Sequence, residues 1–382
     1  MSLFLREPSK LCFRKQGLVR SSPPHSDAIS FPSSQTPPCL ILCADYWEEG
    51  LGQLRYLLAP DLEKKAPMNL VYNDDTNGEM VRIGSSHGWV ATRRSDGTLR
   101  LQDDLDPAAS DTDPKRIPLP PLETLPYHQD QIITNVSMSS SSPEDEDCIF
   151  AVKFLGDRLS YCRPGQSNSP PLWTDVRIAN PCFYSSRVFF SKKDDMFHIP
   201  ASSGHLIGSW NLRKDQLKPK LKKLEFKNIP KLTKTKRELL DSCCTTEYLV
   251  ESISTDETFL VKHYKKTDKI LDDAVINMTT KAVMVFRLDG EGNAVYTQDI
   301  GDLCIFISMS EPFCVPFSSL PSEPLMMPPN AVIIVTDGEF TAIKLADGSY
   351  IFTEIGRFPC PFYIPPRDKE QTTNLELERI QV

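Results

Sequence analysis

The feature that most constrains the fold is a series of short β-forming segments joined by tight turns. Residues 88–93 and 98–102 are a clear pair: the first is rich in β-formers, and the second alternates polar with apolar side chains. The intervening Asp96-Gly97 suits a hairpin, because Asp and Gly tolerate the positive φ angles of such a turn. We therefore expect an antiparallel hairpin whose second strand turns both of its leucines toward a core.

Similar segments recur along the chain, and turn residues such as Asp347-Gly348 separate many of them. One short helix is predicted at 235–242, and the proline-rich segment 310–330 is predicted to be a surface loop. Further strands are predicted at 40–47, 69–72, 131–136, 148–154, 158–162, 173–178, 186–190, 196–199, 205–212, 221–226, 247–251, 258–263, 282–288, 294–299, 303–308, 331–335, 340–345 and 349–353.

These strands fall into groups of about four that repeat about every fifty to seventy residues, a spacing typical of β-propeller blades. A four-stranded sheet cannot bury both faces alone, whereas radial stacking buries them against neighbouring sheets. The prediction is an all-β fold: a single β-propeller over residues 41–366 with six four-stranded blades, five or seven being the alternatives. The N-terminal strands then complete a sixth blade or close the ring. A pair of β-sandwiches is the other architecture that the pattern allows.

Composition narrows the functional classes. The 382 residues include 43 basic and 51 acidic ones, and this acidic balance argues against a protein that mainly coats nucleic acid. No apolar run approaches the roughly 18 to 20 residues that a membrane helix needs, so no membrane span is expected. The eleven cysteines are scattered without a CxxC pair, and Cys39 and Cys43 have no second pair to complete a zinc site. We predict free thiols, a reducing compartment and no metal.

The two ends of the chain differ in composition from its body. Up to Gln35 the chain has five basic residues, two acidic ones and eight serines, a pattern typical of organelle transit peptides. Residues 1–40 are therefore predicted to be a transit peptide or disordered leader, with the mitochondrion as destination and a plastid or dual targeting as the alternatives. An ordinary disordered N-terminus is the simpler interpretation. Residues 367–382 are predicted to be a polar tail.

Two charged segments have a functional and a structural interpretation. The segment 213–237 has eleven basic and two acidic residues, so it either binds RNA or an acidic partner, or forms the solvent face of an outer strand with a loop. The Ser137–Asp147 loop is polar, and phosphorylation is the alternative to a plain exposed loop. A third segment crowds carboxylates that calcium would favour, but its spacing matches no calcium loop and a solvated turn is expected. Its acidic residues are Asp103, Asp104, Asp106, Asp111 and Asp113.

Two residues of the hairpin described first invite functional hypotheses. Trp89 either packs between neighbouring blades or lies on a binding face. His87 is expected to be an edge histidine bonded to nearby backbone, the alternative being a ligand or a base. The six histidines form no metal-binding spacing, and no nucleophile-elbow, phosphate-loop or dinucleotide motif occurs. The sequence therefore predicts no catalytic, cofactor-binding or metal-binding residue, no cofactor and no enzyme activity.

Several segments, taken in order, carry a family resemblance: "SSHGWV" at 85–90, "LPPLETLP" at 119–126, "LSYCRPG" at 159–165 followed by "WTDV" at 173–176, "EYLVES" at 247–252, and "VFRLD" through "DIGDLCIFIS" at 285–308. From about residue 40 to 365 the chain resembles the plant domain-of-unknown-function 295 family, the KIB-type, F-box-associated β-propeller domain. The resemblance implies a propeller fold and supplies no catalytic residues.

In the F-box members of that family, the F-box docks on a ubiquitin-ligase scaffold and the propeller is taken to hold the target. Here a transit-like leader stands where the F-box would be, which matches the family's organellar branch, so no ubiquitin-ligase scaffold is expected. The predicted function is a non-catalytic interaction module of a plant organelle that holds a protein partner on its blade-loop face. The alternatives are an RNA-binding organellar factor using 213–237, or an F-box-type substrate-recognition protein that has lost its F-box. An enzyme with a site in the central channel is the rival class.

Overall fold

The computed structural model describes residues 39–48, 50–56, 63–71, 80–94, 97–107, 109–122, 132–166, 171–271, 275–320, 327–336, 339–354 and 363–364. The chain divides into two compact units, 1–33 and 34–382, and all the described residues lie in the second.

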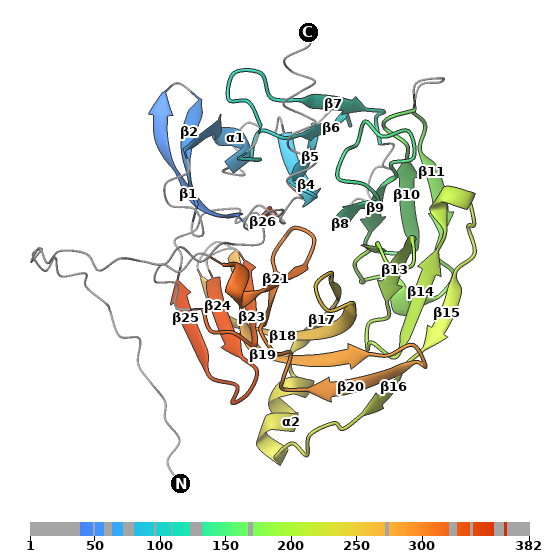
Figure 1. Cartoon of the computed structure of the whole chain (residues 1–382), viewed down its shortest axis with the longest axis vertical. Helices are drawn as coiled ribbons and strands as arrows, with labels where there is room; N and C mark the ends of the chain where they lie inside the picture. The colour runs from blue at the N-terminus through green and yellow to red at the C-terminus, as the bar shows by residue number, and fades with distance from the viewer. Residues whose placement is uncertain are drawn as a thin grey trace, which may run out of the picture. The chain divides into compact units, whose positions relative to one another are not determined.

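Six sheets make up the described residues, four with four strands and two with five (Figure 1). Sheet 1 has the order β26 (Tyr363–Ile364), β1 (Cys39–Glu48), β2 (Leu51–Tyr56), β3 (Lys64–Pro67). Sheet 2 has β4 (Met80–Ser86), β5 (Trp89–Arg94), β6 (Leu99–Gln102), β7 (Arg116–Leu119). Sheet 3 has β8 (Ile133–Met138), β9 (Phe150–Phe154), β10 (Arg158–Cys162), β11 (Thr174–Arg177).

The remaining three sheets follow the same plan. Sheet 4 has β12 (Phe189–Ser191), β13 (Met196–Pro200), β14 (Leu206–Trp210), β15 (Lys220–Lys223). Sheet 5 has β17 (Cys244–Ser252), β18 (Glu257–Leu271), β19 (Val275–Leu288), β20 (Asn293–Thr297), β16 (Glu225–Lys227). Sheet 6 has β22 (Phe313–Pro316), β21 (Leu303–Ile307), β23 (Ala331–Thr336), β24 (Glu339–Lys344), β25 (Tyr350–Glu354).

The first strand named in each sheet lies on the inside, where sheets meet: β4 contacts β8, β8 contacts β12, and β17 contacts β22. The C-terminal strand β26 pairs with β1, so chain segments more than 300 residues apart share sheet 1. The N-terminal strands thus complete a sheet with the end of the chain, as the strand pattern predicted. The predicted all-β propeller fold is confirmed.

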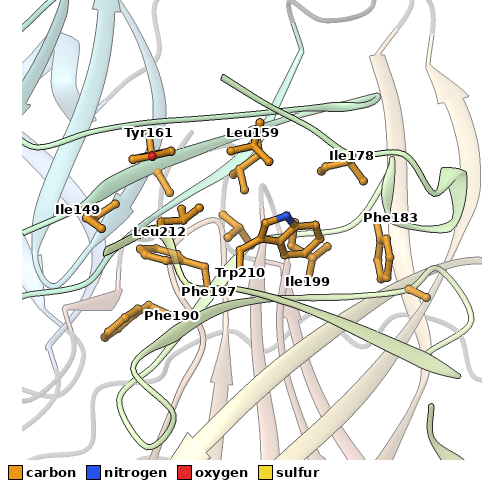
Figure 2. Close-up of a cluster of buried hydrophobic side chains, with 14 residues drawn as sticks. Ile149, Leu159, Tyr161, Ile178, Phe183, Phe190, Phe197, Ile199, Trp210 and Leu212 are labelled. Atoms are coloured by element: carbon orange, nitrogen blue, oxygen red, sulfur yellow. The ribbon is translucent and has the colours of Figure 1, made fainter. Parts of the chain in front are cut away.

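Apolar side chains hold the sheets together by packing between neighbouring sheets. Figure 2 shows the cluster between sheets 3 and 4, where Trp210 is fully buried and meets Phe183 edge to face at 5.9 Å. Gly208 makes room for this indole, because a Cβ there would lie 2.8 Å from the Trp210 ring. Similar clusters join sheets 1 and 2, 2 and 3, 4 and 5, and 5 and 6. Sheets 2 to 5 therefore bury both faces against their neighbours, the arrangement that radial stacking requires.

The hairpin described first is confirmed. Strands β5 and β6 pair antiparallel, both leucines of β6 are at most 1% exposed, and Gly97 has a φ of +84°. The short helix is also confirmed as α2 (Lys234–Asp241).

Three local predictions are wrong. Residues 69–72 were expected to be extended, but the structure has a helical turn, α1 (Met68–Val71), because so short a segment with few apolar residues fits either state. The loop predicted at 310–330 contains β22, an edge strand that tolerates the flanking prolines. The strand predicted at 221–226 is two strands, β15 and β16, which belong to different sheets. No helix among the described residues has the length and apolar character that crossing a membrane requires.

Candidate binding site on the loop face

Five turns lie on one face of the sheets; four follow the inner strands of sheets 2 to 5, and the fifth leads into the inner strand β22 of sheet 6. They follow β4, β8, β12, β17 and β21, and we call this surface the loop face. Its turns contact one another: the N–H of Glu311 donates to Ser85 O at 3.3 Å, and Trp89 Nε1 donates to Ser141 O at 3.0 Å. On the other side, Lys193 pairs with Asp256 at 2.9 Å. The loop face is therefore a connected surface drawn from sheets 2 to 6.

A buried serine recurs at the end of each of these strands, and its hydroxyl accepts a backbone N–H. The N–H of Ile149 donates to Ser139, that of Asp194 to Ser191, and that of Thr255 to Ser252, at 2.9 to 3.3 Å. The equivalent serines of sheets 2 and 6 are Ser86, which accepts from Met138, and Ser308, which accepts from Ser310. All five are at most 7% exposed. In sheets 4, 5 and 6 the N–H belongs to the turn itself, whereas Ser139 accepts from the residue before β9 and Ser86 accepts from strand β8 of the next sheet.

The turn after β4 meets the turn after β21 through one carboxylate. Glu311 accepts a hydrogen bond of 2.5 Å from the Ser86 hydroxyl and another from the backbone of His87. His87 Nδ1 lies 3.1 Å from Ser86 Oγ and 3.6 Å from Glu311 Oε2. Burial raises the pKa of Glu311 to about 7, although the Ser86 hydrogen bond acts in the opposite direction. The predicted edge histidine thus faces a polar cluster rather than open solvent, with its side chain 12% exposed.

Arg187 links sheet 4 to the same loop of sheet 6. Its Nη2 donates to Met309 O at 3.0 Å, and its guanidinium lies 5.5 Å from the centre of the Tyr248 ring. Burial lowers the pKa of Arg187. Beside these groups, the hydroxyls of Ser85 and Ser186 are buried and have no hydrogen-bond partner among the described residues. The inner part of the loop face is therefore closely packed.

The outer part of the loop face is exposed and carries apolar side chains. Ile253 is 73% exposed and Met309 is 45% exposed, and charged residues of the turn after β12 lie beside the β17 turn. Glu251 accepts from the N–H of Lys192 at 3.1 Å and also from the Ser191 hydroxyl. Exposed apolar side chains on fixed, polar surroundings can anchor a protein partner.

Sequence reasoning singled out Trp89, and the structure places it between sheets 2 and 3. Its side chain is 6% exposed and packs in a cluster with residues such as Leu101 and Phe150. Of the two interpretations of Trp89, packing between blades is therefore correct. Its indole N–H nevertheless fixes the turn after β8, so Trp89 supports the loop face from below.

The acidic turn was expected to be solvated, and this is wrong for three of its five carboxylates. Asp103, Asp104 and Asp106 are each at most 6% exposed, whereas Asp111 and Asp113 are exposed. The reason is that cations and backbone donors reach the turn, as in the 2.6 Å pair of Asp104 with Arg116 and the 2.9 Å pair of Asp111 with the buried Lys64. Burial raises the pKa of Asp103 to about 6, and its acidic neighbours add to this effect. Within the described part of the chain, no group of three or more His, Cys, Asp or Glu side chains has a metal-binding arrangement.

The other predicted residues lie away from the loop face or outside the described side chains. The seven cysteines that the structure describes are free, and Cys148, Cys162 and Cys304 are buried in or beside strands like small hydrophobes. The side chains of Cys39 and Cys43 lie outside the described residues. The basic segment 213–237 lies along the outer strands of sheets 4 and 5.

Consecutive sheets packed face to face, with the turns of their inner strands gathered on one surface, define a β-propeller domain. A family model described as "KIB1-4 beta-propeller" matches residues 62–352. The chain belongs to this family, so the KIB-type part of the resemblance seen in the sequence is confirmed. No curated protein matches the chain in sequence.

Similar solved structures resemble the chain only distantly. Sqt1 of Saccharomyces cerevisiae is 8% identical, with a TM-score of 0.34, over 80% of this chain and 69% of that chain. The periplasmic gluconolactonase PpgL of Pseudomonas aeruginosa is 10% identical, with a TM-score of 0.36, over 86% and 99%. The PQQ-bound aldose sugar dehydrogenase of Streptomyces coelicolor is 9% identical, with a TM-score of 0.27, over 74% and 80%. Likeness at this level carries no argument about function.

Proposed function

We propose that this chain is a non-catalytic interaction module that holds a protein partner on its loop face. The observation that carries the proposal is the exposure of Ile253 and Met309 on turns that hydrogen bonds and ion pairs already fix. Anchors on a fixed surface lose little conformational freedom when a partner covers them, so most of the burial free energy contributes to affinity. KIB1-4 family membership, and its resemblance to the plant family described above, support a role in binding.

The state of the polar groups supports binding rather than catalysis. The Ser86 hydroxyl donates to Glu311 and accepts from the N–H of Met138 at 3.0 Å. A nucleophile needs a base that accepts its proton and an open approach for the substrate. Glu311 does accept from Ser86, but Ser86 is only 2% exposed and so lacks the open approach. Its hydrogen bonds instead hold neighbouring sheets together.

The proposal includes the place of action: a plant organelle, with the mitochondrion ahead of a plastid or dual targeting. The basic, serine-rich composition of residues 1–40 supports it. No ubiquitin-ligase scaffold is expected among the partners.

The variant Ile253→Asp tests both the binding of a partner through the loop face and the proposed location in an organelle. The immobilised full chain and this variant are exposed to extracts of mitochondria, plastids and cytosol, with and without nuclease, and the captured proteins are compared. We expect proteins from an organelle extract that bind the wild type and are lost, by at least tenfold, from the variant, because a buried charge replaces an apolar anchor.

Ile132→Asp is the matched control, because Ile132 is 55% exposed and precedes β8 at the opposite end of the sheets. It should retain every partner. Equal capture by both variants would contradict binding through the loop face, and capture from cytosol alone would contradict the proposed location. A partner set that nuclease removes would favour the RNA-binding alternative.

A further inference from the structure

The outer strands of sheets 4 and 5 form a second surface, separate from the loop face. After β15 the chain leaves the outer edge of sheet 4, and β16 pairs parallel with β20 at the outer edge of sheet 5. Helix α2 follows, and Figure 1 shows it beside sheet 5, away from the inner strands. All four residues of β15 are exposed. We call residues 220–241 the basic edge.

An apolar groove of about 400 Å³ lies between α2 and the strands β18 and β19. Ile229 lines this groove and is 55% exposed, so an apolar side chain is in contact with solvent at the groove. Exposed apolar surface of this kind marks an interaction site more often than a neutral surface. Its apolar and aromatic lining includes Phe226, Leu232, Leu240, Tyr264, Met284 and Phe286.

The charge around the groove is strongly positive, whereas the chain as a whole is acidic. Residues 213–237 have eleven basic and two acidic side chains, against a net charge of −8 for the full chain. Lys231, Lys236 and Arg237 are exposed, and the structure shows no ion pair for them within the residues it describes. Two lysines of the basic edge form ion pairs among the described residues, Lys227 with Glu225 and Lys234 with Glu238, but both pairs are 3.9 Å long and exposed. Lys222 donates to the Asp289 carbonyl at 3.1 Å. Glu238 and the groove residue Asp241 are the acidic groups of α2 and compensate only part of this charge.

The aromatic rings of the groove favour a protein partner over RNA. Lys262 Nζ lies 4.2 Å from the centre of the Phe226 ring, and Phe286 meets the same ring edge to face at 4.8 Å. Single-stranded RNA needs open ring faces on which bases stack, and these contacts occupy the Phe226 ring. An apolar groove instead fits aliphatic or aromatic side chains, while the surrounding cations fit carboxylates.

We infer that the groove and the basic edge form a docking surface for an acidic segment of a partner protein, which inserts large apolar side chains between α2 and strands β18 and β19. Charge complementarity identifies the occupant. The carboxylates of an acidic segment pair with the cations of the basic edge, and its apolar side chains pack against Ile229 and into the groove. This surface is separate from the loop face, so the inference goes beyond the proposed function and does not depend on it.

Selection from a library of random twelve-residue peptides tests the inference on the full-length chain. Peptides retained by the wild type, after depletion on Ile229→Asp, should combine several Asp or Glu with at least one Leu, Ile, Phe or Trp. The best peptide, labelled and measured by fluorescence anisotropy, should bind Ile229→Asp at least tenfold more weakly. The double variant Lys231→Glu/Lys236→Glu should lose a similar factor, and raising the salt concentration should weaken wild-type binding.

Lys214→Glu/Lys218→Glu is the matched control, because both lysines are exposed and it makes the same change of charge in the same basic segment, but outside the groove and the basic edge. It should weaken binding less than threefold. An equal loss in both double variants would show non-specific attraction and overturn the groove. Failure to enrich any acidic peptide, or tighter binding of a random twenty-nucleotide RNA that the same variants abolish, would also overturn the inference. Ile253→Asp changes the loop face and should bind the peptide as the wild type does. Failure of the groove inference can therefore be told apart from failure of the proposed function.

Discussion

The loop face and the basic edge differ in how their polar groups are satisfied. On the loop face, charged and hydroxyl groups bond to one another, as Ser86 and Arg187 do with the turn after β21. On the basic edge, cations such as Lys231 and Lys236 extend into solvent next to an apolar groove. The first surface is fixed before any partner arrives, whereas the second gains its interactions only when a partner supplies carboxylates.

This difference predicts different physical behaviour. A surface whose buried polar groups satisfy each other resists change, because removing one member leaves its partner buried and unpaired. A surface of exposed, like-signed charges contributes little to folding but attracts an acidic partner, and salt screens that attraction. Substitutions on the loop face should therefore affect stability most, and substitutions on the basic edge should affect binding alone.

The largest effect is expected at Trp89, which supports the loop face. Trp89→Ala removes a nearly buried indole between sheets 2 and 3, together with its hydrogen bond to Ser141 O. Large-to-small changes of buried aromatic residues cost about 3 to 5 kcal/mol, a large part of the total stability of a domain. Denaturant unfolding of the full chain measures this free energy.

Trp89→Phe is the control for the hydrogen bond. It keeps most of the apolar surface and loses the indole N–H, so the expected cost is about 1 to 2 kcal/mol. A Trp89→Ala protein as stable as the wild type would show that the loop face does not depend on packing beneath it. Substitutions at the loop face would then affect stability no more than substitutions at the basic edge.

The sequence predicted the body of the fold where pattern and turn chemistry agreed. Strands β9 and β10 follow this rule, because an apolar run and an alternating run flank Gly156-Asp157. The pattern failed at α1, where a four-residue segment is too short to distinguish helix from strand. It also failed at β22, where flanking prolines concealed an edge strand that uses few ladder hydrogen bonds.

The loop face could be predicted only in part, because its contacts join residues that are far apart in the chain. Ser86 and Glu311 are separated by 225 positions, and no local pattern indicates that they meet. One signal does exist: a serine lies at the end of the strand before the loop-face turn in five sheets, as Ser191 and Ser252 do. This repeat would have identified the common turn position in the sequence, although not which turns touch.

A smaller, pH-dependent effect is expected at Glu311, inside the loop face. Burial raises its pKa from 4.5 to about 7, so the folded protein holds this proton more tightly than the unfolded chain. The resulting stabilisation is complete below pH 4.5 and is lost as the pH rises through 7. Glu247 and Asp103 also have raised pKa values, about 7 and about 6, so the wild type alone does not isolate Glu311.

Glu311→Gln isolates it, because the amide is neutral at every pH. Relative to the wild type, the variant should gain stability between pH 4.5 and pH 8, by on the order of 2 kcal/mol. Parallel denaturant titrations of both proteins at these two pH values measure the difference. If the difference stays constant, Glu311 is solvated in the folded protein and is not buried between the two turns of the loop face.

The smallest effect is expected on the basic edge. Lys231→Ala/Lys236→Ala removes two exposed charges for which the described structure shows no ion pair, so the free energy of unfolding should change by less than about 0.5 kcal/mol. Lys64→Ala is the contrasting lysine, because Lys64 is 1% exposed and donates to Ala109 O at 2.8 Å beside Asp111. Its loss removes a buried side chain together with its hydrogen bond and ion pair, and should cost clearly more, on the order of 2 to 3 kcal/mol. A comparable loss of unfolding free energy in the double variant would mean that Lys231 and Lys236 hold α2 in place. The distinction between a fixed loop face and a basic edge that acts only in binding would then be wrong.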